Sequence, residues 1–308
     1  MIFMLEKEMT KFRLFSDNHY YYNRHYNEEY TDEMFSKLND GFEGVNLIAG
    51  DVGSSPNEVK EFCYKYIPNQ RAIIIGGNHF MYGFQASYED LNKEYKKVLG
   101  EYDCLGSGNL IVFANRDDYS CQKTEDDFDI HAPIVFGATL WTNFMSDGVD
   151  KQEEAMRAAE YGVSDFRFTY VVPGSTYRGV IMSPYDMWKE FEHTLADIKI
   201  AYIRAMQKGR KFILMTHFPV TPESTAEEFK GSPLNPYFCN DLRKWIIENI
   251  PNTAFILQGH QHNRWQGKIE DKEKGVSIPI YQNPFGYITQ NETYAEPEWN
   301  PNLIVEVE

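Results

Sequence analysis

The sequence predicts an α/β protein whose strands are buried inside sheets. Three observations predict it: short apolar runs that are almost uninterrupted, segments of helical pattern between them, and polar side chains directly after the runs. Near-continuous apolar runs are typical of strands that are covered on both faces. Strands that alternate with helices indicate an α/β fold.

The strands are predicted from the apolar runs, most of which hold three or more consecutive apolar residues. Each run has the length of an ordinary strand in a globular protein. We expect the clearest runs to form the centre of the fold and the weaker ones to lie beside them. The clear candidates are residues 11–17, 45–51, 71–78, 133–139, 211–217 and 253–260, and the weaker ones are residues 110–114, 278–283 and 303–307.

The helices are predicted from apolar spacing and from the residues at their ends. Pro56 suits a first helical turn, Ser183 and Pro184 suit a cap and a first turn, and Gly209 and Pro251 suit helix ends. The expected helices are residues 28–39, 56–66, 87–98, 150–161, 183–207 and 239–249.

Domain organisation is predicted from the absence of repeats, of low-complexity linkers and of a break in composition. We therefore expect one domain over residues 1–308. Residues 141–182 fit the alternation of strands and helices least well. They are predicted to form an insertion or a lid.

The composition restricts the partners and the location. A net charge of −16 disfavours binding to extended nucleic acid, while a small anionic substrate stays compatible if bound cations reverse the local field. The four cysteines form no C-x-x-C pair, which favours reduced thiols. The acidic N-terminus does not resemble a signal peptide, and no apolar run is long enough to span a membrane. We expect a cytoplasmic protein without a membrane segment.

Polar side chains follow five of the predicted strands, in the segments SDNH, AGDVG, GGNHF, THFP and QGHQH. Five of the eight histidines lie in these segments. Ligands bind beyond the carboxyl ends of strands in open α/β sheets. Imidazole, carboxylate and amide groups bind divalent first-row metals. Each segment alone also suits an ordinary turn, but five of them after apolar runs favour a metal site.

These segments, in this order, resemble the calcineurin-like metallophosphoesterase family over residues 12–265. The family pattern is Asp-x-His, Gly-Asp, Gly-Asn-His with a following acid, His with a nearby Pro, and Gly-His-x-His. The resemblance implies two packed mixed β-sheets flanked by helices, an α/β/β/α sandwich. It is specific to the superfamily and leaves the substrate open.

The resemblance also implies the residue roles and the reaction. A metal-bridging hydroxide would attack phosphorus, and His79 would stabilise the developing charge or protonate the leaving group. Mn is the expected metal for both sites, with Fe, Zn, Co, Ni and Mg as alternatives. The implied ligands are Asp17, His19 and His262 for one ion, Asn78, His217 and His260 for the other, and Asp51 for both.

One position departs from the family pattern. Phe80 follows His79, where many relatives have a carboxylate. An acidic neighbour would orient the imidazole and raise its pKa. Either His79 is a weaker acid–base group here, or another carboxylate takes that place.

Three further residues are candidate substrate contacts: Asn143, Arg167 and Arg264. Arg167 and Arg264 offer a planar fork of donors that suits phosphate oxygens, but structural ion pairs explain them equally well. The run of residues 20–22, three tyrosines, suits stacking on a base, although packing is the ordinary role of tyrosine.

The leading functional hypothesis is hydrolysis of a phosphomonoester or phosphodiester of a small molecule, such as a small nucleotide. A nuclease is an alternative that the acidic charge disfavours. A phosphoprotein phosphatase is a second alternative. A non-catalytic binding scaffold is a third, which the complete set of ligand positions disfavours.

Overall fold

The first four strands form one sheet, most of the later ones form a second, and the last strand returns to the first sheet. The computed structural model describes residues 9–83, 86, 88–100, 111–120, 132–171, 180–288 and 299–308. In the first sheet, β1 to β4 are parallel, and β13 is antiparallel to β1. The order is β13 (Ile304–Val307), β1 (Thr10–Phe15), β2 (Val45–Ile48), β3 (Arg71–Ile74) and β4 (Ile111–Phe113).

The second sheet has a parallel centre and antiparallel edges. Strands β12, β10, β9 and β6 are parallel, while β11 and β5 run antiparallel at the two edges. A separate two-stranded sheet pairs β7 (Tyr170–Val171) with β8 (Val180–Ile181). The order in the second sheet is β11 (Trp265–Asp271), β12 (Val276–Gln282), β10 (Thr253–Gln258), β9 (Phe212–Thr216), β6 (Ile134–Ala138) and β5 (Asp117–Ser120).

A buried apolar layer joins the two sheets. Phe12 and Leu14 of β1 belong to the same cluster as Phe255 and Leu257 of β10. The Phe12 and Phe255 rings meet edge to face with centroids 5.8 Å apart. Phe15, on the opposite face of β1, belongs to the larger cluster beneath the helices. The strands are therefore covered on both faces, which explains their continuous apolar runs.

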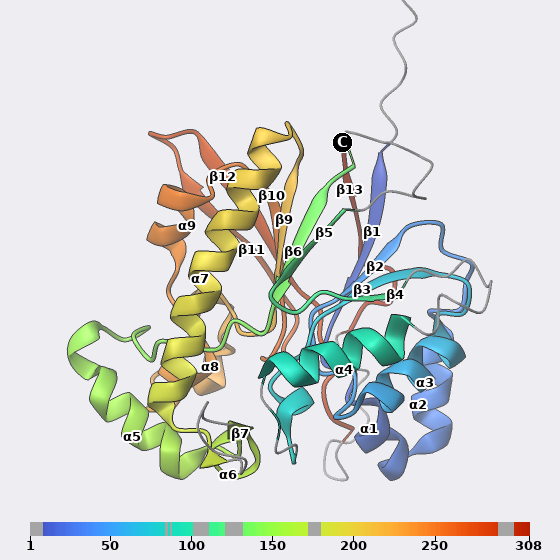
Figure 1. The fold of residues 1–308 in the computed structure, drawn as a ribbon, viewed down its shortest axis with the longest axis horizontal. Helices are drawn as coiled ribbons and strands as arrows, with labels where there is room; N and C mark the ends of the chain where they lie inside the picture. Colours follow the sequence, from blue (N-terminus) through green and yellow to red (C-terminus); the bar gives the residue numbers. More distant parts are fainter. Residues whose placement is uncertain are drawn as a thin grey trace, which may run out of the picture.

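Helices cover the outer faces. Figure 1 shows α1 to α4 beside the first sheet, with α7 and α9 beside the second. Ser183 caps helix α7, as its sequence predicts, and the structure adds a capping box between Ser183 and Asp186. The helices are α1 (Tyr20–Tyr26), α2 (Glu28–Ser36), α3 (Pro56–Tyr66), α4 (Tyr88–Gly100), α5 (Gln152–Gly162), α6 (Asp165–Phe168), α7 (Pro184–Gln207), α8 (Asn235–Phe238) and α9 (Arg243–Asn249). Single turns of 3-10 helix are η1 (His79–Met81), η3 (Val149–Lys151), η4 (Pro222–Ser224) and η5 (Glu227–Phe229).

The predicted fold class is confirmed, and a few elements differ from the prediction. The expected helix over residues 28–39 ends at Ser36, and the expected helix over residues 239–249 begins only at Arg243. Strand β11 and helix α1 were not among the predicted elements. Residues 141–182 contain η3, α5, α6, β7 and β8, and residues 172–179 lie outside the described part. The single domain and the lid stay predictions.

The cysteines and the membrane expectation can be compared with the described residues. Cys63 and Cys239 are buried free thiols, whereas Cys104 and Cys121 lie outside the described residues. Burial raises the pKa of both described thiols, Cys239 to about 11. Among the helices that the structure describes, none combines the length and the apolar character that a membrane crossing requires.

Candidate metal centre

The carboxyl ends of strands from both sheets meet at one edge of the molecule. Asp17 and His19 follow β1, and Asp51 follows β2. An isolated bridge between Ser16 and Pro284 joins the end of β1 to the end of β12, so the two sheets touch here. The remaining predicted ligands follow β3, β9 and β10, namely Asn78, His217, His260 and His262.

The backbone turns sharply at these strand ends. Asp17, His19, Asp51 and His260 have positive φ angles of 53°, 39°, 51° and 67°. The left-handed region is unfavourable for most side chains, but Asp, Asn and His enter it more often than others. Backbone hydrogen bonds hold the turns together, from Asp17 N to Gly50 O and from His19 N to Asp51 O.

Glycines make room for the ligand groups. A Cβ added at Gly77 would lie 1.8 Å from Asp51 Oδ1, and one at Gly259 would lie 2.8 Å from Asp17 Oδ2. A Cβ at Gly50 would lie 2.6 Å from His217 Nδ1. Glycine is therefore required at positions 50, 77 and 259, because a side chain there would collide with the neighbouring ligand residue.

His217 lies at the centre of the buried part of the site. Its Nδ1 donates to the carbonyl of Ala49 over 2.8 Å, which leaves a lone pair on Nε2 in the neutral ring. That Nε2 lies 3.0 Å from Asn78 Oδ1, 3.3 Å from Asp51 Oδ2 and 3.3 Å from His260 Nδ1. These atoms all offer lone pairs, so they require either a proton or a cation between them.

The charges of the metal-free cluster follow from this crowding. Burial opposes protonation of His217, but the Asp51 carboxylate overcomes it and raises the pKa of His217 to about 9. Burial would raise the pKa of Asp51, but the His217 charge holds it well below its ordinary value. A proton on His217 therefore stands where a metal ion would otherwise balance the carboxylate.

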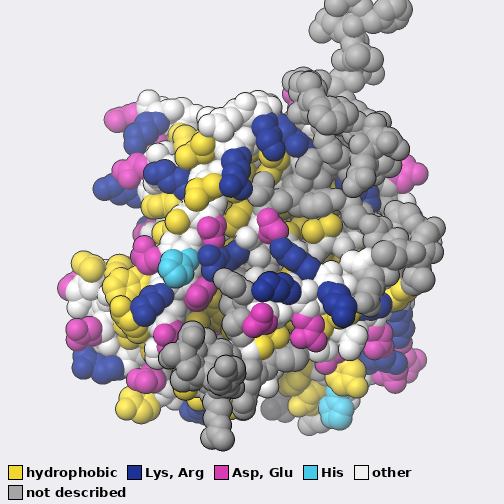
Figure 2. Space-filling model, in the orientation of Figure 1, with side chains coloured by type: hydrophobic (Ala, Val, Ile, Leu, Met, Phe, Trp, Pro, Cys, Tyr) yellow, Lys and Arg dark blue, Asp and Glu magenta, His cyan; other side chains and the backbone are white. Residues whose placement is uncertain are grey.

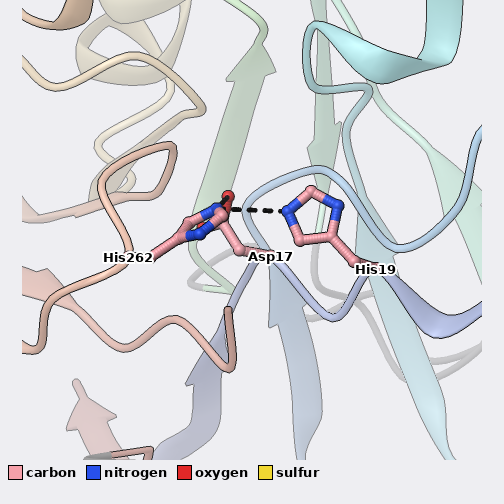
Figure 3. A group of neighbouring side chains, drawn as sticks. All are labelled: Asp17, His19 and His262. Atoms are coloured by element: carbon pink, nitrogen blue, oxygen red, sulfur yellow. Dashed lines mark hydrogen bonds and ion pairs between the residues drawn. The ribbon is translucent and has the colours of Figure 1, made fainter. Parts of the chain in front are cut away.

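Asp17, His19 and His262 form a second group of donors, and Figure 3 shows their side chains pointing toward one another. The Nε2 atoms of His19 and His262 are 3.1 Å apart, and His262 Nε2 is 3.6 Å from Asp17 Oδ1. One donor atom from each residue lies within 4.8 Å of the others. Burial lowers the pKa of His19 well below its ordinary value, so its ring is a neutral donor.

Asp51 connects the two groups. Its carboxylate forms one compact set with Asp17 and His217, and another with His19 and His79. The donors are nitrogen and oxygen atoms of the types that bind Mn, Fe, Zn and Co. These sets fit two divalent ions that share one carboxylate.

Comparison of the sequence with family profiles identifies the family. A profile of the calcineurin-like phosphoesterase family matches residues 10–264. The chain belongs to the calcineurin-like phosphoesterase family. Membership supports metal-dependent hydrolysis of a phosphate ester, and the donor sets described above are its candidate metal ligands.

One solved structure agrees with the fold. The phosphopantetheinyl hydrolase of Mycobacterium tuberculosis is 14% identical, with a TM-score of 0.58 and coverage of 90% of each chain. A dimetal phosphatase from Danio rerio is 12% identical, with a TM-score of 0.45 and coverage of 89% of this chain and 86% of its own. No curated protein sequence matches the chain.

His79, the residue that the calcineurin-like phosphoesterase pattern sets apart from the ligands, lies at the rim of the cluster. Its Nε2 is 3.9 Å from Asp51 Oδ2 and 3.3 Å from the Tyr287 hydroxyl, and a quarter of its side chain (25%) is exposed. Its ring stacks on Tyr82 with centroids 4.3 Å apart. The distance to Asp51 also suits a metal donor, so its role remains a proposal.

The neighbour of His79 points away from the site. Phe80 is buried and packs against Tyr95 and Phe113 in the core. A carboxylate at this position would therefore lie in an apolar environment. The carboxylate that does lie beside the cluster is Asp165, which sequence reasoning did not select.

The residues predicted to contact substrate interact with other parts of the protein. Asn143 Oδ1 accepts from the backbone N–H of Met145, and Arg167 donates to the carbonyl of Tyr161. Both Arg167 and Arg264 are exposed. Their roles as substrate contacts stay predictions.

Proposed function

We propose that the chain hydrolyses a phosphomonoester or phosphodiester of a small molecule with two divalent ions, Mn²⁺ being the first to test. The convergence of metal-binding atoms around His217 Nε2 carries this proposal, because a divalent ion placed among them would supply the positive charge that a proton otherwise supplies. Asp51 would be shared by the ions. The other ligands would be Asp17, His19 and His262 on one side and Asn78, His217 and His260 on the other.

The bound ions would activate a water and neutralise the phosphate charge. Within the chain, Asp51 holds the two groups of donors at a fixed separation, and Ala49 fixes the tautomer of His217. His79 lies at the exposed rim, where its Nε2 can meet the oxygen of a leaving group. We assign it the role of general acid.

Aromatic rings beside Asp17, His19 and His262 support a nucleotide as the substrate class. Tyr287 stacks on His19 with centroids 4.1 Å apart, and Tyr22 meets Tyr287 edge to face at 4.7 Å. Tyr22 and Tyr26 are 42% and 43% exposed, so a base can reach their rings. Stacking of bases on aromatic side chains is common in nucleotide recognition.

The charge of the molecule favours a small substrate over a nucleic acid. Figure 2 shows basic and acidic side chains interspersed on the face that carries α4 and α7. A long polyanion gains affinity from a continuous basic surface. The net charge of −16 adds repulsion over distance.

The test is a substrate panel with the Mn²⁺-loaded protein. The panel compares aryl phosphate mono- and diesters, mononucleotides, cyclic nucleotides, dinucleoside polyphosphates, a phosphopeptide, and single- and double-stranded DNA. We expect turnover of small esters, its loss with a chelator and its return with Mn²⁺. Turnover that persists after both metals are removed would sink the proposal, and preferential cleavage of DNA would replace it with a nuclease.

The contribution of the aromatic rings is tested with Tyr22→Leu against Tyr21→Leu. Both tyrosines are exposed on α1, but neighbouring helix positions face different directions. Stacking is worth at least about 1 kcal/mol, so Tyr22→Leu should raise KM for a mononucleotide roughly 5-fold. KM for an aliphatic phosphate ester should not change. Equal effects of the two variants would exclude Tyr22 from the base site.

A further inference from the structure

Asp165 is a buried carboxylate at the start of α6, beside the cluster but outside the set of predicted ligands. It is 1% exposed. Its Oδ2 accepts hydrogen bonds from Asn78 Nδ2 over 3.2 Å, from the Tyr82 hydroxyl over 3.0 Å and from the Tyr237 hydroxyl over 2.7 Å. A buried carboxylate is costly unless it is hydrogen-bonded, so three donors on one oxygen hold it firmly.

Each of these donors touches a different part of the metal centre. The Asn78 side chain presents its Oδ1 to His217 at 3.0 Å. The Tyr82 ring stacks on His79, and the Tyr237 ring meets His260 edge to face with centroids 5.7 Å apart. Asp165 therefore contacts one predicted ligand directly and two other site residues through aromatic rings.

The contact with Asn78 determines which end of the amide faces the cluster. A side-chain amide has one oxygen and one nitrogen, and only the oxygen binds a cation. A carboxylate accepts hydrogen bonds but does not donate them, so Asp165 selects the orientation in which Nδ2 faces it. The amide oxygen then points to the opposite side, toward His217 Nε2.

We propose that Asp165 is a positioning residue that locks the Asn78 amide with its oxygen toward the metal centre and holds Tyr82 against His79. The proposal rests on the metal assignment made above. Its link to His79 runs through the Tyr82 hydroxyl and ring. Asp165 comes 87 residues after Asn78, from the region predicted as an insertion.

The test is a Mn²⁺ titration of the wild type and Asp165→Ala, followed by electron paramagnetic resonance. Loss of a residue that orients a metal ligand weakens metal affinity about 10–100-fold. We expect Asp165→Ala to bind one ion normally and the other about 10–100-fold more weakly. At a Mn²⁺ concentration that gives a coupled pair in the wild type, the variant should show the six-line signal of isolated Mn²⁺.

Two further variants separate positioning from stability. Asp186→Ala removes one half of the capping box of α7, which lies outside the metal centre, so it should lower Tm and keep both Mn²⁺ affinities. Asp165→Asn keeps the size of the side chain and should show a smaller loss of the same Mn²⁺ affinity. Wild-type affinities in both Asp165 variants, or in Asp165→Asn alone if Asp165→Ala does not fold, would overturn the proposal. A wild type that binds fewer than two ions would instead contradict the metal assignment itself.

Discussion

The two sides of the metal centre differ in how they are enclosed. We call Asn78, His217 and His260 the buried side and Asp17, His19 and His262 the open side. The contrast lies at two histidines: His217 has no exposed surface, whereas the side chain of His262 is 30% exposed, while Asp17 and His19 of the open side are themselves buried. The buried side is held by a backbone carbonyl and by Asp165, while the open side is held by the Tyr287 ring.

This difference suggests that the two sides have different functions, one in holding the metal and the other in admitting substrate. Ligands that are locked by buried hydrogen bonds keep their geometry and release a metal slowly. The open side gives substrate and water access to the cluster, because His79, His262 and Tyr287 lie there. We infer that substrate approaches over the open side, with the buried side as the fixed platform.

Asp51→Asn should have the largest effect, because Asp51 belongs to both sides. Its replacement removes the shared negative charge while it keeps the shape of the side chain. Turnover of an aryl phosphate ester should fall by about 10³-fold or more, since one electrostatic group at a developing charge is worth about 10²–10³-fold. Mn²⁺ stoichiometry should fall as well. Retention of two tightly bound ions would show that Asp51 is not shared.

Gly77→Ala should have the next largest effect, because the new Cβ would force Asp51 to move. A displacement of about 1 Å at a catalytic group can lower turnover by roughly 10²-fold. The control is Gly100→Ala, at the end of α4, where a Cβ meets open space. Steady-state kinetics should separate the two variants, and equal activities would mean that the Asp51 position is not critical.

His217→Ala and His262→Ala compare the two sides directly. His217→Ala leaves the buried Asp51 charge without its partner and should destabilise the metal-free protein by roughly 3–5 kcal/mol. His262 is partly exposed, and its removal should change the unfolding free energy by less than about 1 kcal/mol. Denaturant unfolding in a chelator measures both. Equal destabilisation would remove the distinction between the two sides.

The smallest effect is a change of stability with pH. The pKa of folded His217, about 9, lies above its ordinary value of 6.5, so its contribution is complete below 6.5 and is lost as pH rises through 9. Tm of the metal-free protein should therefore fall by a few degrees over this interval. Mn²⁺ must displace the proton, so metal affinity should rise over the same interval. If Tm changed with pH in the same way with and without Mn²⁺, the role of His217 would be contradicted.

Much of the fold was predictable because its central strands are buried on both faces. Strand β11 was missed because it lies at a sheet edge and its residues alternate in exposure, with polar side chains in most positions. Helix α1 was missed because only Tyr20 and Asn23 of it are buried. Elements with little apolar surface give a weak periodic signal.

The candidate metal site was predictable in part for a related reason. Its residues directly follow apolar runs, so local sequence marks them. Asp165 has no such mark, because its partners Asn78, Tyr82 and Tyr237 lie far from it along the chain. The prediction selected Arg167 from the same segment, whereas the structure places Arg167 on the surface and Asp165 inside.

The positive φ angles at Asp17, His19, Asp51 and His260 restrict how this chain can be redesigned. A library that seeks a new metal preference would ordinarily include Val, Ile and Thr as neutral replacements. At these positions β-branched residues lose a ligand and also strain the backbone by roughly 1–2 kcal/mol each. Asn and Gly are the replacements that isolate the ligand effect. A library limited to these replacements would contain variants that differ in metal binding and few that misfold.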